Sequence, residues 1–522
     1  MIALNGKNLD ISQLWRAAAL TEPCALADAA RPAMDKSRAY VERLAAEPRA
    51  IYGINTGFGP LSAHRVSQAD QAQHQLNLLH HLSAGQGELF SPVETRAIMV
   101  ARANSLCRGH SGIRPAVIDL ALATLNAGIL PEIPQEGSVG ASGDLVPLAH
   151  MARALVGLGY VRTAEGRRLP ATEALASIGL TPAVLGAKEG LALVNGTSVM
   201  TGTTALSVHE AGQLLSWAEL LTAALFEVQN GAPEVLCEHT HRARGHKGQR
   251  ETARRITAHL RTHAVYAELI DAHAWGSEAK PFDEGKEIQD PYSLRCVPQV
   301  LGAFQDALWH VEQVVVRELN ATTDNPLIFA DYEMVIHAGH FYGQHVAMVA
   351  DYLRLGLVKL ALLLDRQLEQ LVNWRYSRGL SPMLAGGTPG LNSGMMGCQL
   401  LATAMAAEAR MLATPASVQT IPTNANNQDV VSMGTHAARW TRRVLPLVWK
   451  LSAIQAIALC QASDLRGGPP KGEHFRALYE RVRAVSPTIA EDRPLFEEVA
   501  AVAALLQEEG VQTALLPARR RG

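Results

Sequence analysis

The run of sequence that decides the fold and chemistry of this chain is Gly137-Ser138-Val139-Gly140-Ala141-Ser142-Gly143-Asp144-Leu145. The small residues Ala141, Ser142 and Gly143 let the backbone turn so tightly that the Gly143 nitrogen could attack the Ala141 carbonyl carbon. Ring closure, followed by loss of water from the ring and of the Ser142 hydroxyl, would leave a methylidene-imidazolone, an electrophile that ordinary side chains do not supply. Asp144 and Pro147 suit the N-cap and first turn of a helix, whose positive end would favour electron density in that ring. The fragment alone is equally typical of a structural loop-to-helix junction, so the rest of the chain must decide.

Length and composition describe a large globular protein. The 522 residues include 48% hydrophobic and 18% charged residues, which favours a packed core over disorder. The net charge of -2 gives no electrostatic case for binding nucleic acid or a membrane surface. The six cysteines include no Cys-x-x-Cys pair, and the first ten residues lack a secretory signal. We therefore expect reduced thiols and a cytoplasmic location.

Hydrophobic periodicity predicts a mainly α fold. A helix is expected over 71–82, a capping box over 91–94 opens another, and a small hairpin within 158–169 is one of few strand candidates. Long helices, each able to span a domain, are predicted at 203–226, 297–319, 344–374, 394–413 and 435–465. The expected organisation is an N-terminal globular domain, residues 1–200, and an elongated central helix bundle, residues 201–522.

Two segments raise questions of membrane and metal binding. The apolar stretch 444–461 is interrupted by Lys450 and Gln455, so we interpret it as a long buried helix and not as a membrane span. A second group of residues gathers metal-ligating types, namely Cys237, His239, His241 and His246. Their spacing fits no standard zinc pattern, and we expect no metal site.

Three further segments carry groups suited to chemistry. Residues 51–59 place the phenol of Tyr52 in a glycine-rich loop, which could also be an ordinary surface loop with a packing tyrosine. Residues 290–296 put Tyr292 and Arg295 on one side of a helical turn, and an arginine fork matches a carboxylate. That pair alone could be an interface salt bridge. The polar stretch 318–326 follows a helix and would ordinarily be a turn.

Residues 137–150 resemble the cofactor-forming segment of the aromatic amino acid lyase family, and the other motifs recur in that family's order along nearly the whole chain. The family includes histidine, phenylalanine and tyrosine ammonia-lyases and related aminomutases. The resemblance implies that Ala141-Ser142-Gly143 becomes 4-methylidene-imidazol-5-one (MIO) autocatalytically, with no metal. It also implies that Tyr52, on an inner lid loop, is the catalytic base and that residues 274–286 form a second lid. A homotetramer with active sites built from three chains would follow.

The resemblance implies roles for the other candidate residues. Arg295 would hold the substrate carboxylate, with Tyr292 beside the cofactor and Asn325 near the same carboxylate. Asn195 would contact the cofactor oxygen or the substrate amine, and Phe341 would pack near the ring. The family's usual Gly-Asn-Phe reads Gly-His-Phe over residues 339–341, which leaves any polar role at position 340 unassigned.

Two positions narrow the substrate. His81 and Leu82 fall where phenylalanine lyases have Phe-Leu and histidine lyases have Ser-His, and His-Leu resembles the tyrosine-selective pair. A buried imidazole can bond a phenolic hydroxyl and disfavours an analogue that lacks it, although a core histidine bonded to backbone is the alternative. Gln428, which follows the candidate substrate contact Asn424 in the run 424–429, stands where histidine lyases have glutamate. A neutral amide there argues against histidine as substrate.

Together these features predict a tyrosine ammonia-lyase that converts L-tyrosine to trans-p-coumarate and ammonia. Tyr52 would take the β-proton, so the site must favour phenolate over a phenol whose ordinary pKa is about 10. A phenylalanine lyase of broad specificity and a 2,3-aminomutase are the alternatives within the family. A non-catalytic helical assembly protein is the alternative outside it, against which the intact Tyr52, Tyr292 and Arg295 weigh.

Overall fold

The computed structural model describes residues 1–261, 266–268 and 289–517, and the expected second lid at 274–286 lies outside the described residues. The chain forms two compact units. The first comprises residues 1–209, 311–351 and 415–442, and the second comprises residues 210–310, 352–414 and 443–522. This organisation differs from the expected boundary after residue 200, because two segments from the second half of the chain fold into the first unit.

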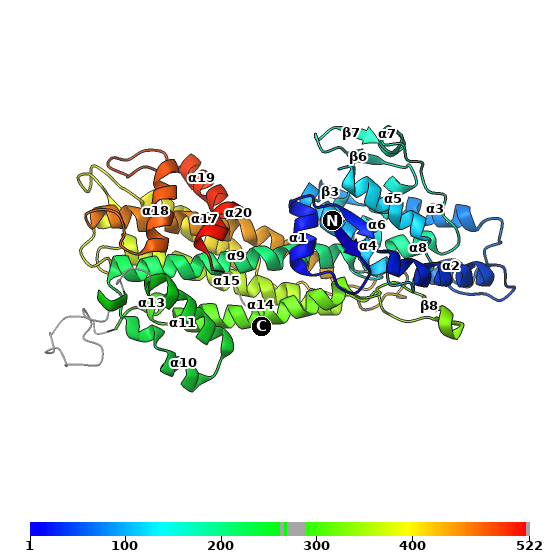
Figure 1. Cartoon of the computed structure of the whole chain (residues 1–522), viewed down its shortest axis with the longest axis horizontal. Coiled ribbons are helices and arrows are strands. Elements are labelled where there is room, and N and C mark those ends of the chain that lie inside the picture. The colour runs from blue at the N-terminus through cyan, green and yellow to red at the C-terminus, as the bar shows by residue number, and fades with distance from the viewer. Residues whose placement is uncertain (262–265, 269–288, 518–522) are drawn as a thin grey trace. The chain divides into compact units, whose positions relative to one another are not determined.

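The first unit is built around a buried helix, α4 (Pro92–Leu106). The capping box predicted at its start is present: the Ser91 backbone N–H donates to the Glu94 carboxylate at 2.9 Å, and the Ser91 hydroxyl accepts from the Glu94 N–H at 3.3 Å. Nearly every residue of α4 is buried, because other helices of the unit surround it (Figure 1). The helices of this unit are α1 (Ile11–Ala19), α2 (Arg31–Ala45), α3 (Gln71–Leu82), α5 (Pro115–Asn126), α6 (Leu145–Leu155), α7 (Ala171–Ser177) and α8 (Glu189–Val194).

The strands of the described residues are short and form four small sheets. The predicted hairpin is confirmed as β6 (Tyr160–Arg162) and β7 (Arg168–Pro170), which β4 (Leu130–Pro131) extends to three strands. The sequence did not predict the parallel pair β1 (Ile2–Leu4) and β2 (Cys24–Leu26), since three-residue strands are too short to show alternation. The remaining pairs are β3 (Gln86–Leu89) with β5 (Pro134–Glu136), and β8 (Leu327–Phe329) with β9 (Met334–Ile336).

Five long helices lie within a few residues of their predicted bounds. They are α9 (Ser198–Gln229), α14 (Val297–Leu319), α15 (Gln344–Val372), α16 (Met396–Met411) and α17 (Gly434–Leu465). Four of them, α9, α14, α15 and α17, contribute residues to both units. Helix α17 is long and apolar enough to cross a membrane, but 83% of its most apolar window is buried within the protein. That burial agrees with its interpretation as a core helix.

The described part of the second unit consists of helices and the loops that join them. Its other helices are α10 (Glu238–Arg244), α11 (Lys247–Leu260), α13 (Tyr292–Arg295), α18 (Glu473–Val485), α19 (Phe496–Gln507) and α20 (Glu509–Leu515). A buried ion pair joins α11 to α9, with Arg255 Nε 2.6 Å from a Glu219 carboxylate oxygen. The indole N–H of Trp217 donates to the Leu506 carbonyl at 2.8 Å and so ties α9 to α19. The prediction of a mainly α fold with few strands is therefore confirmed.

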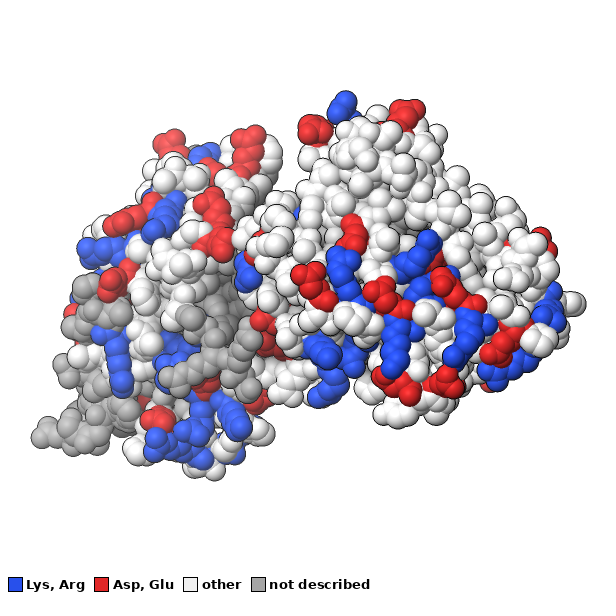
Figure 2. Space-filling view, turned by 45° about the vertical axis from the view of Figure 1, so that its right-hand side comes forward, with Lys and Arg blue, Asp and Glu red and all other residues white. Residues whose placement is uncertain are grey.

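The visible face of the first unit in Figure 2 shows no segregation of charged side chains by sign. On the right of the face in Figure 2, acidic and basic side chains are interspersed. Ion pairs account for part of this mixing, such as Arg31 with Asp119 at 2.9 Å and Arg43 with Glu333 at 2.5 Å. This face therefore presents no large field of one sign of the kind that attracts a polyanion.

Candidate active site

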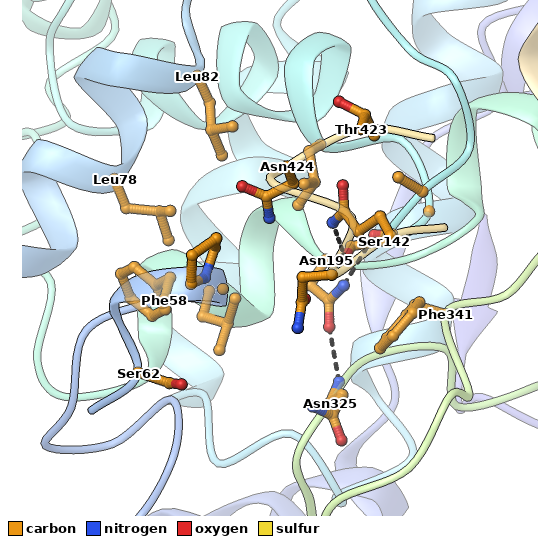
Figure 3. Close-up of a pocket in the computed structure, with 18 of the residues that line it drawn as sticks. Phe58, Ser62, Leu78, Leu82, Ser142, Asn195, Asn325, Phe341, Thr423 and Asn424 are labelled. Carbon is orange, nitrogen blue, oxygen red and sulfur yellow. Dashed lines mark hydrogen bonds between the residues drawn. The ribbon is translucent and has the colours of Figure 1, made fainter. Parts of the chain in front are cut away.

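One pocket of the first unit brings together most of the candidate residues. It has a volume of about 1400 Å³. The predicted residues that line it are Tyr52, His81, Leu82, Ala141, Ser142, Gly143, Asn195, Asn325, Phe341, Asn424 and Gln428. Figure 3 shows Phe58, Leu78 and Leu82 on one side of this pocket and Ser142, Asn195 and Phe341 on the other. Five separate stretches of sequence thus converge on the Ala-Ser-Gly triplet.

The triplet lies in a turn that admits no side chain at its third position. Gly143 has φ +69°, and a Cβ atom there would lie 2.1 Å from the Gly196 carbonyl oxygen. Ala141 and Gly143 are bridge partners of each other, and Gly143 is also paired with Gly196. The backbone is therefore folded back on itself as ring closure requires, and only glycine fits the position of the attacking nitrogen.

Asp144 does not cap α6, which corrects the expectation for this residue. It occupies the N-cap position, yet its side chain makes no hydrogen bond to that helix. Instead, its carboxylate accepts from the backbone N–H groups of Val199 at 2.9 Å and Met200 at 3.0 Å, in the first turn of α9. Thr435 also donates to it. Sequence spacing could not reveal this, because the stabilised helix end belongs to a different segment.

The side chain of Asp144 is shielded from solvent. The residue is fully buried, and this burial raises the pKa of its carboxyl to about 6, although its hydrogen bonds act in the opposite direction. Its carboxylate links the segment that follows the triplet to the start of α9 and, through Thr435, to the start of α17. Asp144 therefore fixes the position of the triplet relative to two long helices.

A continuous set of hydrogen bonds surrounds Ser142. The Gln428 side-chain amide donates to the Ser142 hydroxyl at 3.1 Å, and the Asn195 amide donates to the Ser142 carbonyl oxygen at 2.7 Å. The Asn195 side-chain oxygen in turn accepts from the Asn325 backbone N–H at 2.7 Å (Figure 3). Uncharged amides therefore surround the serine, which suits a site where electron density accumulates.

Tyr52 reaches the pocket from the loop 51–66. Its phenolic oxygen lies 3.4 Å from the Gly59 backbone N–H, which points toward it. Gly59 has φ +53°, and a Cβ atom there would meet the Asn424 side chain at 2.7 Å. Glycine is thus required where the loop passes the segment 423–428.

His81 is an unbonded imidazole at the C-terminal end of α3. It lines the pocket, and within the described part of the chain its ring has no hydrogen-bond partner, which distinguishes it from a core histidine bonded to backbone. Partial burial lowers its pKa, with a smaller contribution from His74. The ring is therefore neutral at pH 7 and able to donate to or accept from a ligand hydroxyl.

Tyr292 and Arg295 are not among the residues that line the pocket. They belong to the second unit, on the short helix α13, where the Arg295 guanidinium lies 4.7 Å from the Tyr292 ring centre. Arg295 also donates to the Asp290 carbonyl oxygen at 3.1 Å, and Tyr292 is 70% exposed. The pocket of this chain is therefore assembled without the predicted carboxylate clamp.

Sequence reasoning missed several residues that line the pocket. Phe58 and His74 lie on its wall, and His337 and Tyr342 flank Phe341. The one available signal was spacing, because His74 precedes His81 by seven residues and so shares its face of α3. In contrast, the ring of His241, from the metal-type group, bonds the Val235 carbonyl and the Gln249 side chain, which is a structural arrangement.

Comparisons with known proteins agree with this fold and site. The pattern of the aromatic amino acid lyase family matches residues 9–484. The chain is 42% identical to a histidine ammonia-lyase of Geobacillus thermodenitrificans over 515 residues, 99% of both chains. It is 43% identical to a tyrosine ammonia-lyase of Cupriavidus metallidurans over 481 residues, 90% of both chains. The solved tyrosine aminomutase from Streptomyces globisporus is 36% identical and superposes over 99% of both chains with a TM-score of 0.92.

This chain therefore belongs to the aromatic amino acid lyase family, whose members depend on MIO. Within that family it is a carbon–nitrogen lyase of the ammonia-lyase and aminomutase class, acting on an aromatic amino acid. The relatives named above act on different amino acids, so the choice among substrates depends on the pocket of this chain.

Proposed function

We propose that this protein is a tyrosine ammonia-lyase, which eliminates ammonia from L-tyrosine to give trans-p-coumarate. The observation that carries the proposal is the neutral, unbonded imidazole of His81 in the wall of the pocket that holds the triplet. A phenolic hydroxyl is the natural partner for this ring, and an analogue without the hydroxyl would leave the ring unpaired. The neutral Gln428 beside Ser142 gives no charge for a substrate imidazole.

The residues around the triplet fit the MIO group. The close approach of Gly143 to Gly196 and the pairing of residues 141 and 143 favour ring closure, and Asn195 and Gln428 are placed to hold the ring. When formed, the group supplies an electrophile that makes the substrate amine a better leaving group. The mature chain should weigh two waters less than its sequence, whereas Ser142→Ala should not lose the second water and should abolish turnover. Full activity in that variant would refute the cofactor assignment.

Other side chains of the pocket are suited to proton removal, positioning and the exclusion of water. Tyr52, with its oxygen facing the Gly59 N–H, is placed to take the β-proton. Asn195 and Asn325 hold each other and so fix the polar wall next to Ser142. The apolar side chains Leu78, Leu82 and Phe341 enclose the region where an aromatic ring would bind and exclude water from it.

The same proposal includes a homotetramer in which Tyr292 and Arg295 complete the pocket of another chain. The exposure of Tyr292 in the single chain, together with the absence of Arg295 from the described pocket wall, supports this assignment. Helix α16 also carries large apolar side chains that the chain itself leaves uncovered, namely Met396, Leu400, Leu401 and Met411. A row of this kind on a soluble helix favours burial against another chain.

The experiment that tests the substrate is product analysis of the purified protein with L-tyrosine, L-phenylalanine and L-histidine given separately. We expect p-coumarate as the main product. Predominant cinnamate would favour a phenylalanine lyase and remove the role given to His81, and urocanate would contradict the argument from Gln428.

An aminomutase is the second candidate, because solved tyrosine aminomutases superpose closely on this chain, with a TM-score of 0.93 for one of them. The product analysis separates the two, since an aminomutase returns a β-amino acid from the same substrate. The absence of any product, in a chain of undiminished mass, would instead support the non-catalytic alternative.

A further inference from the structure

The loop that carries Tyr52 is compact and is held by its own backbone. The Val66 N–H donates to the Asn55 carbonyl at 2.9 Å, and the Gly57 N–H donates to the His64 carbonyl at 2.9 Å. The residues of this loop beyond Gly59, through Arg65, are exposed. Ile51 and Ile54 anchor the start of the loop 51–66, here called the lid loop, in a buried cluster with α2. The position of its outer part therefore depends on the other contacts that the loop makes.

One side chain of α3 makes two separate contacts with the lid loop. The His74 ring nitrogen Nε2 lies 3.1 Å from the Thr56 carbonyl oxygen. The same ring stacks on Phe58, with ring centres 4.4 Å apart and an angle of 7° between the planes. Thr56 itself is buried, so its carbonyl would lose a partner without His74. Nothing in the catalytic scheme above uses this imidazole.

The hydrogen bond to Thr56 determines which nitrogen of the His74 ring carries the proton. Because a carbonyl can only accept, Nε2 must carry the proton, which leaves Nδ1 unprotonated in the neutral ring. Burial lowers the pKa of His74, opposed by its bond to Thr56, so the neutral form prevails at pH 7. A neutral imidazole also stacks on an aromatic ring without the cost of desolvating a charge. Both contacts are therefore compatible with one state of one side chain.

We propose that His74 is a positioning residue that holds the outer part of the lid loop on α3, and with it the Gly59 N–H that faces the Tyr52 phenolic oxygen. His74 lies on the same face of α3 as Leu78 and His81, which line the pocket, so it links the base-bearing loop to a helix of the pocket wall. The role in catalysis rests on the function proposed above, whereas the closure of the loop does not.

The test uses trypsin and steady-state kinetics on the full-length protein. Arg65 is exposed within the lid loop, and cleavage after it reports opening of the loop. His74→Leu removes both contacts, His74→Phe keeps the stack alone, and His74→Gln keeps a donor near the Nε2 position alone. His80→Leu is the matched control, since His80 is exposed on the same helix and does not line the pocket.

We expect His74→Leu to be cleaved after Arg65 about fivefold faster than the parent, which is the change that loss of one hydrogen bond produces. The cleavage rates of His74→Phe and His74→Gln should lie between those of the parent and His74→Leu. Cleavage after the exposed Arg167, in the β6–β7 turn, should be unchanged and serves as the internal reference. KM for the substrate should rise by the factor by which the closed fraction falls, which is smaller than the factor in cleavage, while kcat changes less, because substrate binds the closed fraction.

Equal cleavage of His74→Leu, His80→Leu and the parent would overturn the proposal. Faster cleavage after Arg65 with unchanged KM and kcat would also overturn it, because the loop would then open without consequence for the site. If the protein turns over none of the three amino acids, the proposed function fails, while the cleavage comparison still decides whether His74 holds the loop.

Discussion

At the scale of single residues, the pocket is defined by which polar groups have partners. Ser142 is held by Gln428 and Asn195, and Asn195 by Asn325, whereas His81 has no partner in the described part of the chain. A ring without a protein partner is free to bond a ligand hydroxyl. This contrast is the basis for proposing His81 as the position at which a substrate hydroxyl is selected.

Replacing His81 with phenylalanine should shift preference from tyrosine to phenylalanine. The variant loses the group that bonds the hydroxyl, so kcat/KM for tyrosine should fall about 10- to 100-fold, while that for phenylalanine should hold or rise. The measurement is kcat/KM for both substrates. His80→Phe, an equivalent change one residue away and outside the pocket wall, should leave the ratio unaltered. An unchanged ratio in His81→Phe would remove the basis for choosing tyrosine.

Gly143 offers a second residue-scale test with a matched control. Gly143 and Gly166 have similar φ angles, +69° and +79°, but a Cβ at Gly143 would lie 2.1 Å from a carbonyl oxygen, while a Cβ at Gly166 meets nothing within 4 Å. Gly166→Ala should therefore cost only the backbone strain, about 1 kcal/mol. Gly143→Ala should cost well above about 3 kcal/mol or prevent folding.

The readouts for this pair are the free energy of unfolding in urea and the mass of the intact chain. Gly143→Ala should retain the full mass of its sequence, since the attacking nitrogen is displaced, whereas Gly166→Ala should lose two waters like the parent. Equal stability of the two variants would show that residues 143 and 196 are not in close contact.

At the scale of elements, the start of α9 is the centre of the site. Its first N–H groups bind Asp144, and the turn just before it carries Asn195 and Gly196. The positive end of this helix favours the charged carboxylate, while burial opposes it and raises the pKa to about 6. The stability of this junction therefore depends on pH.

The sign of that dependence follows from the shift. The folded-state pKa of about 6 exceeds the unfolded value of about 3.9, so folded protein takes up the proton first as pH falls. The contribution of Asp144 to the free energy of unfolding thus grows as pH falls from about 6 to about 4 and is lost as pH rises. Asp144→Asn should lack this contribution.

The measurement is urea unfolding of the parent and Asp144→Asn at pH 5 and pH 7. The stability difference between them should be larger at pH 5. Asp35→Asn, which alters an exposed carboxyl on α2, should parallel the parent at both values. A constant difference between the parent and Asp144→Asn would mean that the carboxyl has no raised pKa.

Whether the sequence could predict a feature depended on how far apart the contacting residues lie along the chain. The long helices, the capping box of α4 and the β6–β7 hairpin follow from local periodicity and capping, and the structure confirms them. Contacts between distant segments were not accessible in this way. The bonding of Asp144 to α9 and that of His74 to Thr56 depend on how separate segments meet, and no spacing rule reports that.

At the scale of the whole molecule, the proposed assembly makes a prediction about mixed chains. Tyr52 and Ser142 line one pocket of one unit, whereas Arg295 belongs to the other unit. Tyr52→Phe and Arg295→Ala should each be inactive alone, yet coexpression of the two should restore part of the activity. An Arg295→Ala chain keeps an intact Tyr52, and a neighbouring Tyr52→Phe chain would supply its Arg295.

The matched control is coexpression of Tyr52→Phe with Ser142→Ala. Both changes affect the pocket of their own chain, so each pocket keeps one defect and no activity should return. Tetramers should be verified by light scattering in all mixtures. Activity in neither mixture would refute a site shared between chains. Activity in both mixtures would show that activity returns by some means other than Arg295 supplied from a neighbouring chain.

The contact between Asp144 and Thr435 determines when, during synthesis of the chain, the turn around the triplet can form. These residues are 291 positions apart, and Ser432 also donates to the Gly140 carbonyl in the same turn. At 5 to 20 residues per second, a ribosome needs roughly 15 to 60 s to synthesise the intervening chain. The turn around the triplet is thus completed only when translation is almost over. A chain that stalls before α17 should therefore reach the cell's proteases without ever carrying a reactive electrophile.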